Sequence, residues 1–83
     1  MLNNKNILIT GGTGSFGKKF IEFVLKKYKP KKLIIYSRDE NKQFQLQKKW
    51  EKKKYNCLRY LIGDVRDLDR LIFAMEDVDI VIH

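Results

Sequence analysis

The sequence has a single cysteine, a single histidine and no apolar run longer than five residues. Cys57 cannot form a disulfide within the chain, which suits a reducing compartment. His83 has no second imidazole and no cysteine at ligand spacing, so we expect no metal site. A membrane-spanning helix needs about 20 apolar residues, and a secretory signal needs an apolar segment near the amino terminus. Neither is present, and we expect no membrane association and a cytoplasmic location.

Acidic residues are scarce between residues 18 and 54. This block holds 14 of the 18 basic residues but only four of the ten acidic ones, and the formal net charge of the chain is +8. Such a block is typical of proteins that bind nucleic acid, a membrane surface or an anionic small ligand. Most of its lysines fall at expected helix ends and loops, where lysine is favoured and stays solvated. No groove-reading motif accompanies them, and we expect no nucleic-acid partner.

The remaining pattern alternates short β-prone apolar runs with helical segments. Strands are expected at 6–10, 33–36, 58–62 and 78–83, and helices at 15–28, 39–54 and 67–75. This alternation predicts parallel strands joined by helical crossovers, which is an α/β fold. The fourth strand is reached at residue 83 with no helix to cover it. We therefore interpret residues 1–83 as the incomplete, amino-terminal part of a nucleotide-binding domain, and we expect it to aggregate when expressed alone.

The expected helices differ in how clearly one face is apolar. In the first, positions 17, 20, 21, 24, 25 and 28 form one stripe, and Pro30 ends the helix. In the second, Phe44 and Trp50 are the expected anchors. On the third helix, one face is expected to carry Leu68, Leu71, Ile72 and Met75. The rings expected in or near the core are those of Phe16, Phe20, Phe23 and Phe44.

The most informative motif is a glycine-rich loop between the first strand and the first helix, Thr10-Gly-Gly-Thr-Gly-Ser-Phe-Gly17. Its glycines fit the G-x-G-x-x-G spacing of a dinucleotide-binding fingerprint at the strand–helix junction that this fingerprint requires. Gly11 and Gly12 would allow the sharp exit from the strand, Gly14 would admit a pyrophosphate, and Gly17 would allow close helix packing. The alternative is a glycine-rich turn without a ligand. We favour a Rossmann-type doubly wound sheet with strand order 3-2-1-4, whose first helix directs backbone N–H groups at phosphates.

The end of the second strand bears on which dinucleotide is bound. An acidic residue about 20 residues beyond the glycines usually binds the ribose of NAD. Here Ser37 occupies that position, Arg38 follows it, and Lys42 lies one helical turn further. A guanidinium suits a 2′-phosphate, which favours NADP. The alternative is that Asp39 binds the ribose, if the strand ends one residue later than Tyr36.

Asp64 and Val65 follow the third strand, where folds of this class meet the adenine ring. The Asp64 carboxylate would accept a hydrogen bond from the adenine amino group, and Val65 would offer a backbone or apolar contact. The alternative is that Asp64 caps the following turn and Asp67 caps the third helix.

Four segments together resemble one branch of the extended short-chain dehydrogenase/reductase superfamily: residues 6–17, Leu33-Ile-Ile-Tyr-Ser-Arg-Asp-Glu40, Ile62-Gly-Asp-Val-Arg-Asp67 and Asp79-Ile-Val-Ile-His83. That branch is the inverting UDP-N-acetylglucosamine 4,6-dehydratases of pseudaminic acid and polysaccharide synthesis. The resemblance implies a lyase that uses NADP and a UDP-sugar, works as a homo-oligomer when full length, and is of the short, soluble type. With Gly11 and Gly17 of the loop, the candidate cofactor-binding residues are Thr13, Gly14, Ser15, Phe16, Ser37, Arg38, Asp39, Glu40, Asn41, Lys42, Asp64 and Val65.

The resemblance implies that the catalytic Tyr-x-x-x-Lys pair lies beyond His83, so residues 1–83 alone are expected to be inactive. Tyr28 and Lys32 match the spacing, but Pro30 interrupts the helix that would align them. Two alternatives remain open. One is another extended short-chain enzyme, such as a UDP-sugar 4-epimerase or reductase, and the other is a non-catalytic NADP-binding module.

Overall fold

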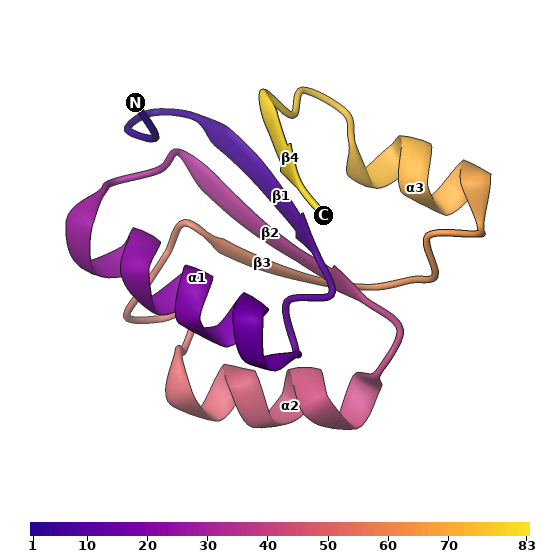
Figure 1. The fold of residues 1–83 in the computed structure, drawn as a ribbon, viewed down its shortest axis with the longest axis horizontal. Helices are drawn as coiled ribbons and strands as arrows, with labels where there is room; N and C mark the ends of the chain where they lie inside the picture. The colour runs from indigo at the N-terminus through magenta and orange to yellow at the C-terminus, as the bar shows by residue number, and fades with distance from the viewer.

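The computed structural model describes all 83 residues and contains one sheet of four parallel strands. The strands are β1 (Asn6–Thr10), β2 (Lys32–Ser37), β3 (Leu58–Ile62) and β4 (Ile80–Ile82). Their order across the sheet is β3-β2-β1-β4, so β1 lies between β2 and β4 (Figure 1). The predicted α/β class and the strand order 3-2-1-4 are confirmed.

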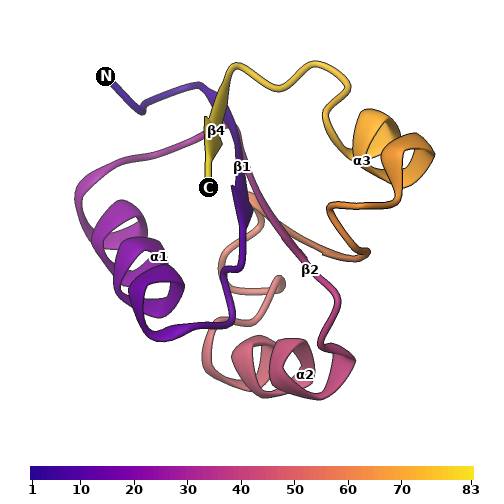
Figure 2. The same cartoon turned by 45° about the vertical axis from the view of Figure 1, so that its right-hand side comes forward.

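Helices cover both faces of the sheet. α1 (Ser15–Lys27) and α2 (Glu40–Lys49) lie on one face, and α3 (Leu68–Ala74) lies on the other (Figures 1 and 2). Successive side chains of a strand point to opposite faces. Accordingly Ile7 and Ile9 join the core beneath α1 and α2, whereas Leu8 packs with Ala74 of α3. The three central side chains of β1, Ile7, Leu8 and Ile9, are fully buried, which explains why the middle of the strand is continuously apolar.

α1 forms as its apolar stripe predicts. Gly17, Ile21 and Val24 are buried against the sheet, while Phe20, Leu25 and Tyr28 pack at the edge of the same core. The helix ends with Lys26 and Lys27 in its last turn, where positive charge complements the helix dipole. Tyr28 has an extended backbone, and Lys32 already belongs to β2. The two residues therefore do not share a helix, which confirms the expectation that the chain leaves the helix between them.

α2 is shorter than predicted and is anchored differently. It ends at Lys49 rather than Lys54, because the backbone of Trp50 leaves the helical region and residues 51–55 form a separate turn. Its buried positions are Gln43, Leu46 and Trp50, spaced as one helical face. The expectation for Phe44 was wrong, since that ring lies one position off this face, exposed, with the Lys48 ammonium over it at 4.7 Å.

Several apolar side chains predicted to be buried are exposed. On α3 only Leu71 and Ala74 pack against the sheet, and Leu68, Ile72 and Met75 face solvent. Among the aromatic rings, Phe16 and Phe23 are also exposed, whereas Phe20 packs at the core edge. The sheet is only four strands wide and carries a single seven-residue helix on the α3 face. That face therefore lacks the neighbours that would bury a full helical stripe. No helix has the length and apolar content needed to span a membrane.

Candidate functional site

A cleft of about 700 Å³ opens at the edge of the sheet where β1, β2 and β3 end. In a parallel sheet the carboxyl ends of neighbouring strands share an edge, so the three loops that follow these strands meet there. The residues that line the cleft are Thr10, Gly11, Thr13, Tyr36, Ser37, Arg38, Asp39, Lys42, Gly63, Asp64, Val65, Arg66 and His83. Segments that lie far apart in the sequence thus form one site.

The start of α1 has unsatisfied hydrogen-bond donors. The backbone N–H groups of Ser15, Phe16 and Gly17 have no acceptor within the chain, and no side chain caps the helix at Gly14. The other two helices differ, because the carboxylates of Asp39 and Asp67 accept from the backbone N–H groups of Lys42 and Arg70. Unsatisfied donors at the positive end of a helix dipole favour an anionic partner.

Two glycines shape this helix start. Gly11 has a φ of +66°, a left-handed conformation that favours glycine and turns the chain out of β1. A Cβ on Gly17 would lie 2.4 Å from the Cα of Gly12, so α1 approaches the loop backbone at this residue. The expected close packing of Gly17 is confirmed, with the loop as its partner. Gly12 differs from expectation, because its φ is not positive and its constraint is the Ile35 side chain, 2.9 Å from the position of an added Cβ.

Gly14 differs from Gly12 and Gly17, because an added Cβ there would face open space. A Cβ built there meets only the carbonyl oxygen of Gly11 at an ordinary 3.5 Å. The extended backbone of Gly14 (φ −82°, ψ 177°) is also open to other residues. Nothing inside the chain therefore requires glycine at this position.

Asp64 lies between two arginines. Its Oδ1 accepts from the backbone N–H of Arg66 at 2.9 Å and from Nε at 3.1 Å, and its Oδ2 accepts from Nη2 of Arg66 at 2.8 Å. Nη1 of Arg38 lies 3.5 Å from the same Oδ2. The side-chain and backbone hydrogen bonds from Arg66, with a smaller contribution from the charge of Arg38, hold the pKa of Asp64 well below its usual range. The carboxylate is thus ionised at neutral pH.

The Ser37 hydroxyl is engaged from inside the protein. Ser37 is 8% exposed, and its Oγ accepts from Nε2 of Gln43 at 2.9 Å. The same amide nitrogen donates to the carbonyl oxygen of Leu61 at 2.8 Å, so the buried Gln43 ties the ends of β2 and β3 together beneath the cleft. Ser37 keeps its hydroxyl hydrogen and one acceptor lone pair available to a ligand.

β2 ends at Ser37, one residue later than predicted, which is the condition under which Asp39 was considered as a ribose ligand. The carboxylate of Asp39 lines the cleft, but its Oδ1 already accepts from the backbone N–H of Lys42 at 2.9 Å as the cap of α2. Asp67 likewise caps α3, which is the role considered for it on sequence grounds. Asp64 accepts a hydrogen bond from the backbone N–H of Arg66 in the following turn, and it also faces the cleft.

The sequence-predicted residues divide into three groups. Eight of them line the cleft: Gly11, Thr13, Ser37, Arg38, Asp39, Lys42, Asp64 and Val65. Gly14, Ser15, Phe16 and Gly17 form the start of α1 beside it. Glu40 and Asn41 instead line a second hollow on the other side of α2, together with Phe44.

Sequence reasoning missed five residues that line the cleft, namely Thr10, Tyr36, Gly63, Arg66 and His83. Tyr36 is fully buried and donates from its hydroxyl to the carbonyl oxygen of Asp64 at 3.0 Å, and burial raises its pKa. Thr10 and His83 hydrogen-bond each other across β1 and β4. Four of these five, all but Arg66, lie at the end of a strand or directly after it, and that position is the signal that locates them.

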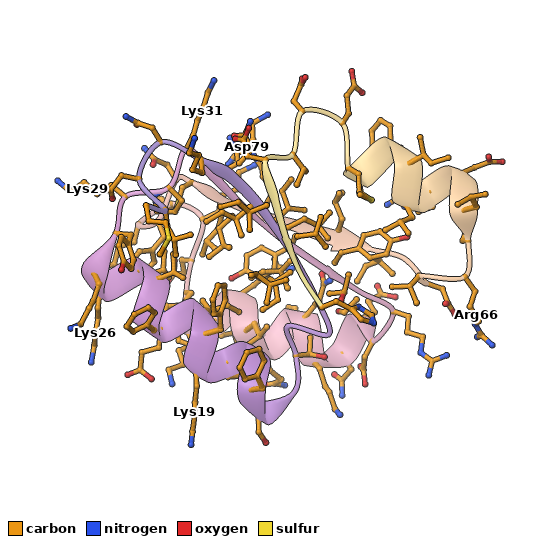
Figure 3. All side chains as sticks on the ribbon, turned by 45° about the horizontal axis from the view of Figure 1, so that its top comes forward. Lys19, Lys26, Lys29, Lys31, Arg66 and Asp79 are labelled. Carbon is orange, nitrogen blue, oxygen red and sulfur yellow. The ribbon has the colours of Figure 1, made fainter.

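Many lysines of the basic block lie far from the cleft. Lys26, Lys29 and Lys31 project from one end of the molecule, and Arg66 projects from the opposite end (Figure 3). In this topology a helix following a strand returns to the amino edge of the sheet, so the lysines at the end of α1 gather there. The expectation that these residues are solvated lysines of helix ends and loops is confirmed for these three, all of which are exposed.

The sequence model of the family described as "Polysaccharide biosynthesis protein" matches residues 7–83, and the chain belongs to this family. Over all 83 residues it is 61% identical to an inverting UDP-N-acetylglucosamine 4,6-dehydratase of Campylobacter jejuni (serotype O:23/36, strain 81-176) and spans 24% of that enzyme. The chain thus covers about a quarter of the curated relative that it matches. The family resemblance inferred from the sequence is confirmed.

Solved structures show the same fold. Pen from Bacillus thuringiensis superimposes with a TM-score of 0.90 and 46% identity, over 100% of this chain and 25% of that one. A Bacillus anthracis dTDP-glucose 4,6-dehydratase, crystallised with NAD, gives a TM-score of 0.67 and 22% identity over 93% of this chain and 25% of that one. The second similarity establishes a common Rossmann-type architecture.

Proposed function

We propose that residues 1–83 bind NADP and form the cofactor-binding part of a sugar-nucleotide 4,6-dehydratase. The observation that carries this proposal is the start of α1, where three backbone N–H groups without acceptors lie beside the glycine loop and no side chain caps the helix. A pyrophosphate supplies the missing acceptors and the negative charge that this helix end favours. The open space at Gly14 leaves room for it against the backbone.

The other cleft residues fit the remaining parts of NADP. Arg38 and Lys42 supply positive charge beside the end of β2, where a 2′-phosphate would lie. Asp64, held ionised, is an acceptor for the adenine amino group, and Val65 lies exposed next to it. Bound in this way, the nicotinamide would supply hydride transfer. The role of this chain is to bind and orient the dinucleotide.

For the whole protein we propose the activity of the Campylobacter jejuni relative, which is 61% identical over this chain. The substrate would be a UDP-sugar, converted to a 4-keto-6-deoxy sugar by a lyase of polysaccharide or pseudaminic acid synthesis. We also propose a cytoplasmic homo-oligomer whose catalytic Tyr-x-x-x-Lys pair lies outside residues 1–83. No residue of this chain is assigned a catalytic role.

The test uses the full-length protein and isothermal titration calorimetry with NADP and NAD. We expect NADP to bind more tightly, and Arg38→Ala to weaken NADP by about tenfold or more without weakening NAD, because charge-assisted hydrogen bonds to the phosphate are lost. Absence of dinucleotide binding would overturn the cofactor proposal, and equal affinities would overturn the preference for NADP. Product analysis with UDP-N-acetylglucosamine should show a 4-keto-6-deoxy sugar, whereas a 4-epimer would refute the dehydratase assignment.

A further inference from the structure

Gln43 is a polar side chain on the buried face of α2. It is 1% exposed and shares that face with Leu46. Its Nε2 lies 2.8 Å from the carbonyl oxygen of Leu61 and 3.2 Å from that of Ile35. A carbonyl oxygen has no hydrogen to donate, so the amide nitrogen of Gln43, and not its amide oxygen, must face these two groups. The orientation of the Gln43 amide is thus fixed by its surroundings.

This orientation determines what the Ser37 hydroxyl can do. Nε2 of Gln43 also lies 2.9 Å from Oγ of Ser37, and an amide nitrogen only donates. Oγ of Ser37 must therefore accept, and its own hydrogen cannot point at the amide. Oγ takes part in no other hydrogen bond within the chain. The hydroxyl of Ser37, which lines the cleft, therefore has a hydrogen for a ligand.

The neighbours of Ser37 indicate which kind of ligand atom accepts this hydrogen. Arg38 and Lys42 line the same cleft and supply positive charge, which favours an anionic oxygen. The acidic residue among them, Asp39, already accepts from the backbone N–H of Lys42 as the cap of α2. A hydrogen bond from a hydroxyl to an ionised phosphate oxygen is stronger than one to a neutral hydroxyl. The Ser37 hydrogen therefore distinguishes a phosphate from a hydroxyl group at this place.

We propose that Gln43 is a positioning residue for the preference for NADP: by donating to Oγ of Ser37, it directs the hydroxyl hydrogen of Ser37 toward the 2′-phosphate. This inference rests on the proposed function and extends it to a buried residue that does not itself line the cleft. NAD has a neutral 2′-hydroxyl in place of the phosphate, so it gains less from the same hydrogen. Without the Gln43 amide the Ser37 hydroxyl rotates freely, and NADP loses more affinity than NAD.

The test is a double-mutant cycle in the full-length protein. The readout is the dissociation constant of NAD divided by that of NADP, measured by calorimetry. Ser37→Ala removes the hydroxyl and should lower this ratio about fivefold or more. Gln43→Met removes the donor without adding charge and should lower the ratio about threefold. In the Ser37→Ala background, Gln43→Met should leave the ratio unchanged, because no hydroxyl remains to be positioned.

Gln45→Met is the matched control. Gln45 belongs to the same helix but is exposed and makes no side-chain hydrogen bond, so the ratio should stay at the wild-type value. A purely structural role of Gln43 predicts that Gln43→Met lowers the melting temperature and weakens NADP and NAD by the same factor. That result, or an equal change of the ratio in both backgrounds, would overturn the positioning role while leaving the cofactor proposal intact.

Ser37→Ala decides the matter even if Gln43→Met does not fold. An unchanged ratio in Ser37→Ala would show that the hydroxyl makes no bond to the phosphate and would overturn the positioning role, whereas a lowered ratio would support it. A wild-type protein that binds neither dinucleotide would overturn both this inference and the cofactor proposal.

Discussion

Gly14 and Gly17 lie three residues apart, and the structure gives them different reasons to be glycine. At Gly17 an added Cβ would lie 2.4 Å from the Cα of Gly12, and backbone cannot yield cheaply. At Gly14 the chain leaves space that the ligand is proposed to fill. One glycine thus serves the fold and the other serves binding, although both belong to the same fingerprint.

Gly17→Ala should therefore destabilise the full-length protein, by about 1–3 kcal/mol as expected for overpacking. Gly14→Ala should cost no more than about 1 kcal/mol, the scale of a change of helix-capping residue. It should nevertheless weaken NADP binding at least tenfold, because a methyl group then occupies the space beside the helix start. Urea unfolding and calorimetry separate the two effects. Normal NADP affinity in Gly14→Ala would contradict this division of roles.

The lowered pKa of Asp64 makes stability depend on pH in a defined direction. Folding favours the ionised carboxylate of Asp64. Its contribution to the free energy of unfolding is therefore present above the unfolded-state pKa of about 3.9 and disappears as the pH falls through the lower folded-state pKa. Asp64→Asn should be less stable than wild type at pH 7, and the difference should shrink as the medium is acidified below about pH 4. Urea unfolding at pH 7 and below about pH 4 measures the stability difference between the two proteins. Asp69→Asn, which removes an exposed carboxylate without hydrogen bonds, controls for net charge, and a difference independent of pH would disprove the assignment.

The candidate residues that the sequence located correctly share one property. Arg38 and Asp64 each follow a strand whose apolar run is unmistakable, and parallel strands bring their carboxyl ends to one edge. Gln43 and Arg66 were not found, because their importance comes from partners rather than from position. Gln43 is a polar residue on the buried face of α2, and Arg66 depends on a local turn that brings its guanidinium back to Asp64.

At the scale of the elements, β1 and β3 have the bounds that the sequence predicted. For β1 the reason is that a buried parallel strand is continuously apolar. The helix ends were predicted less well. Lys52, Lys53 and Lys54 favour helix individually but have no apolar face to dock, so α2 stops at the anchor Trp50. For α3 the sequence predicted an apolar face, and the sheet beneath it is too narrow to bury that face in full.

β3 is fastened to the end of α2 by Tyr60, whose hydroxyl donates to the carbonyl oxygen of Trp50 at 2.7 Å. Tyr60→Phe should lower the free energy of unfolding by about 1 kcal/mol. Burial raises the pKa of Tyr60 to about 12, so folding favours the protonated form. The contribution of the Tyr60 hydroxyl to the free energy of unfolding is therefore complete below the unfolded-state pKa of about 10. It is lost as the pH rises toward the folded-state pKa. Denaturant unfolding at pH 8 and pH 11 should show the gap between the two proteins closing, and a constant gap would refute this account.

At the scale of the molecule, the α3 side of the sheet carries exposed apolar surface from Leu68, Ile72, Phe73, Met75 and Val81. Clustered exposed apolar side chains promote association. The 83-residue chain expressed alone should therefore aggregate, and Ile72→Lys with Phe73→Glu should increase its soluble fraction severalfold. Phe23→Glu, on α1 across the sheet, is the matched control and should have less effect. Size-exclusion chromatography provides the measurement, and a monodisperse, monomeric wild-type chain would contradict the prediction.

The uncapped start of α1 has a thermodynamic consequence. A ligand that binds only the folded state adds to its stability by mass action, at about 1.4 kcal/mol for each tenfold rise in concentration above the dissociation constant. Here the ligand would also accept hydrogen bonds from the free backbone N–H groups of the first turn of α1. The fraction of folded protein would therefore depend on the concentration of the dinucleotide. A cell depleted of the dinucleotide would then hold less of this protein in its native state, before any change in turnover.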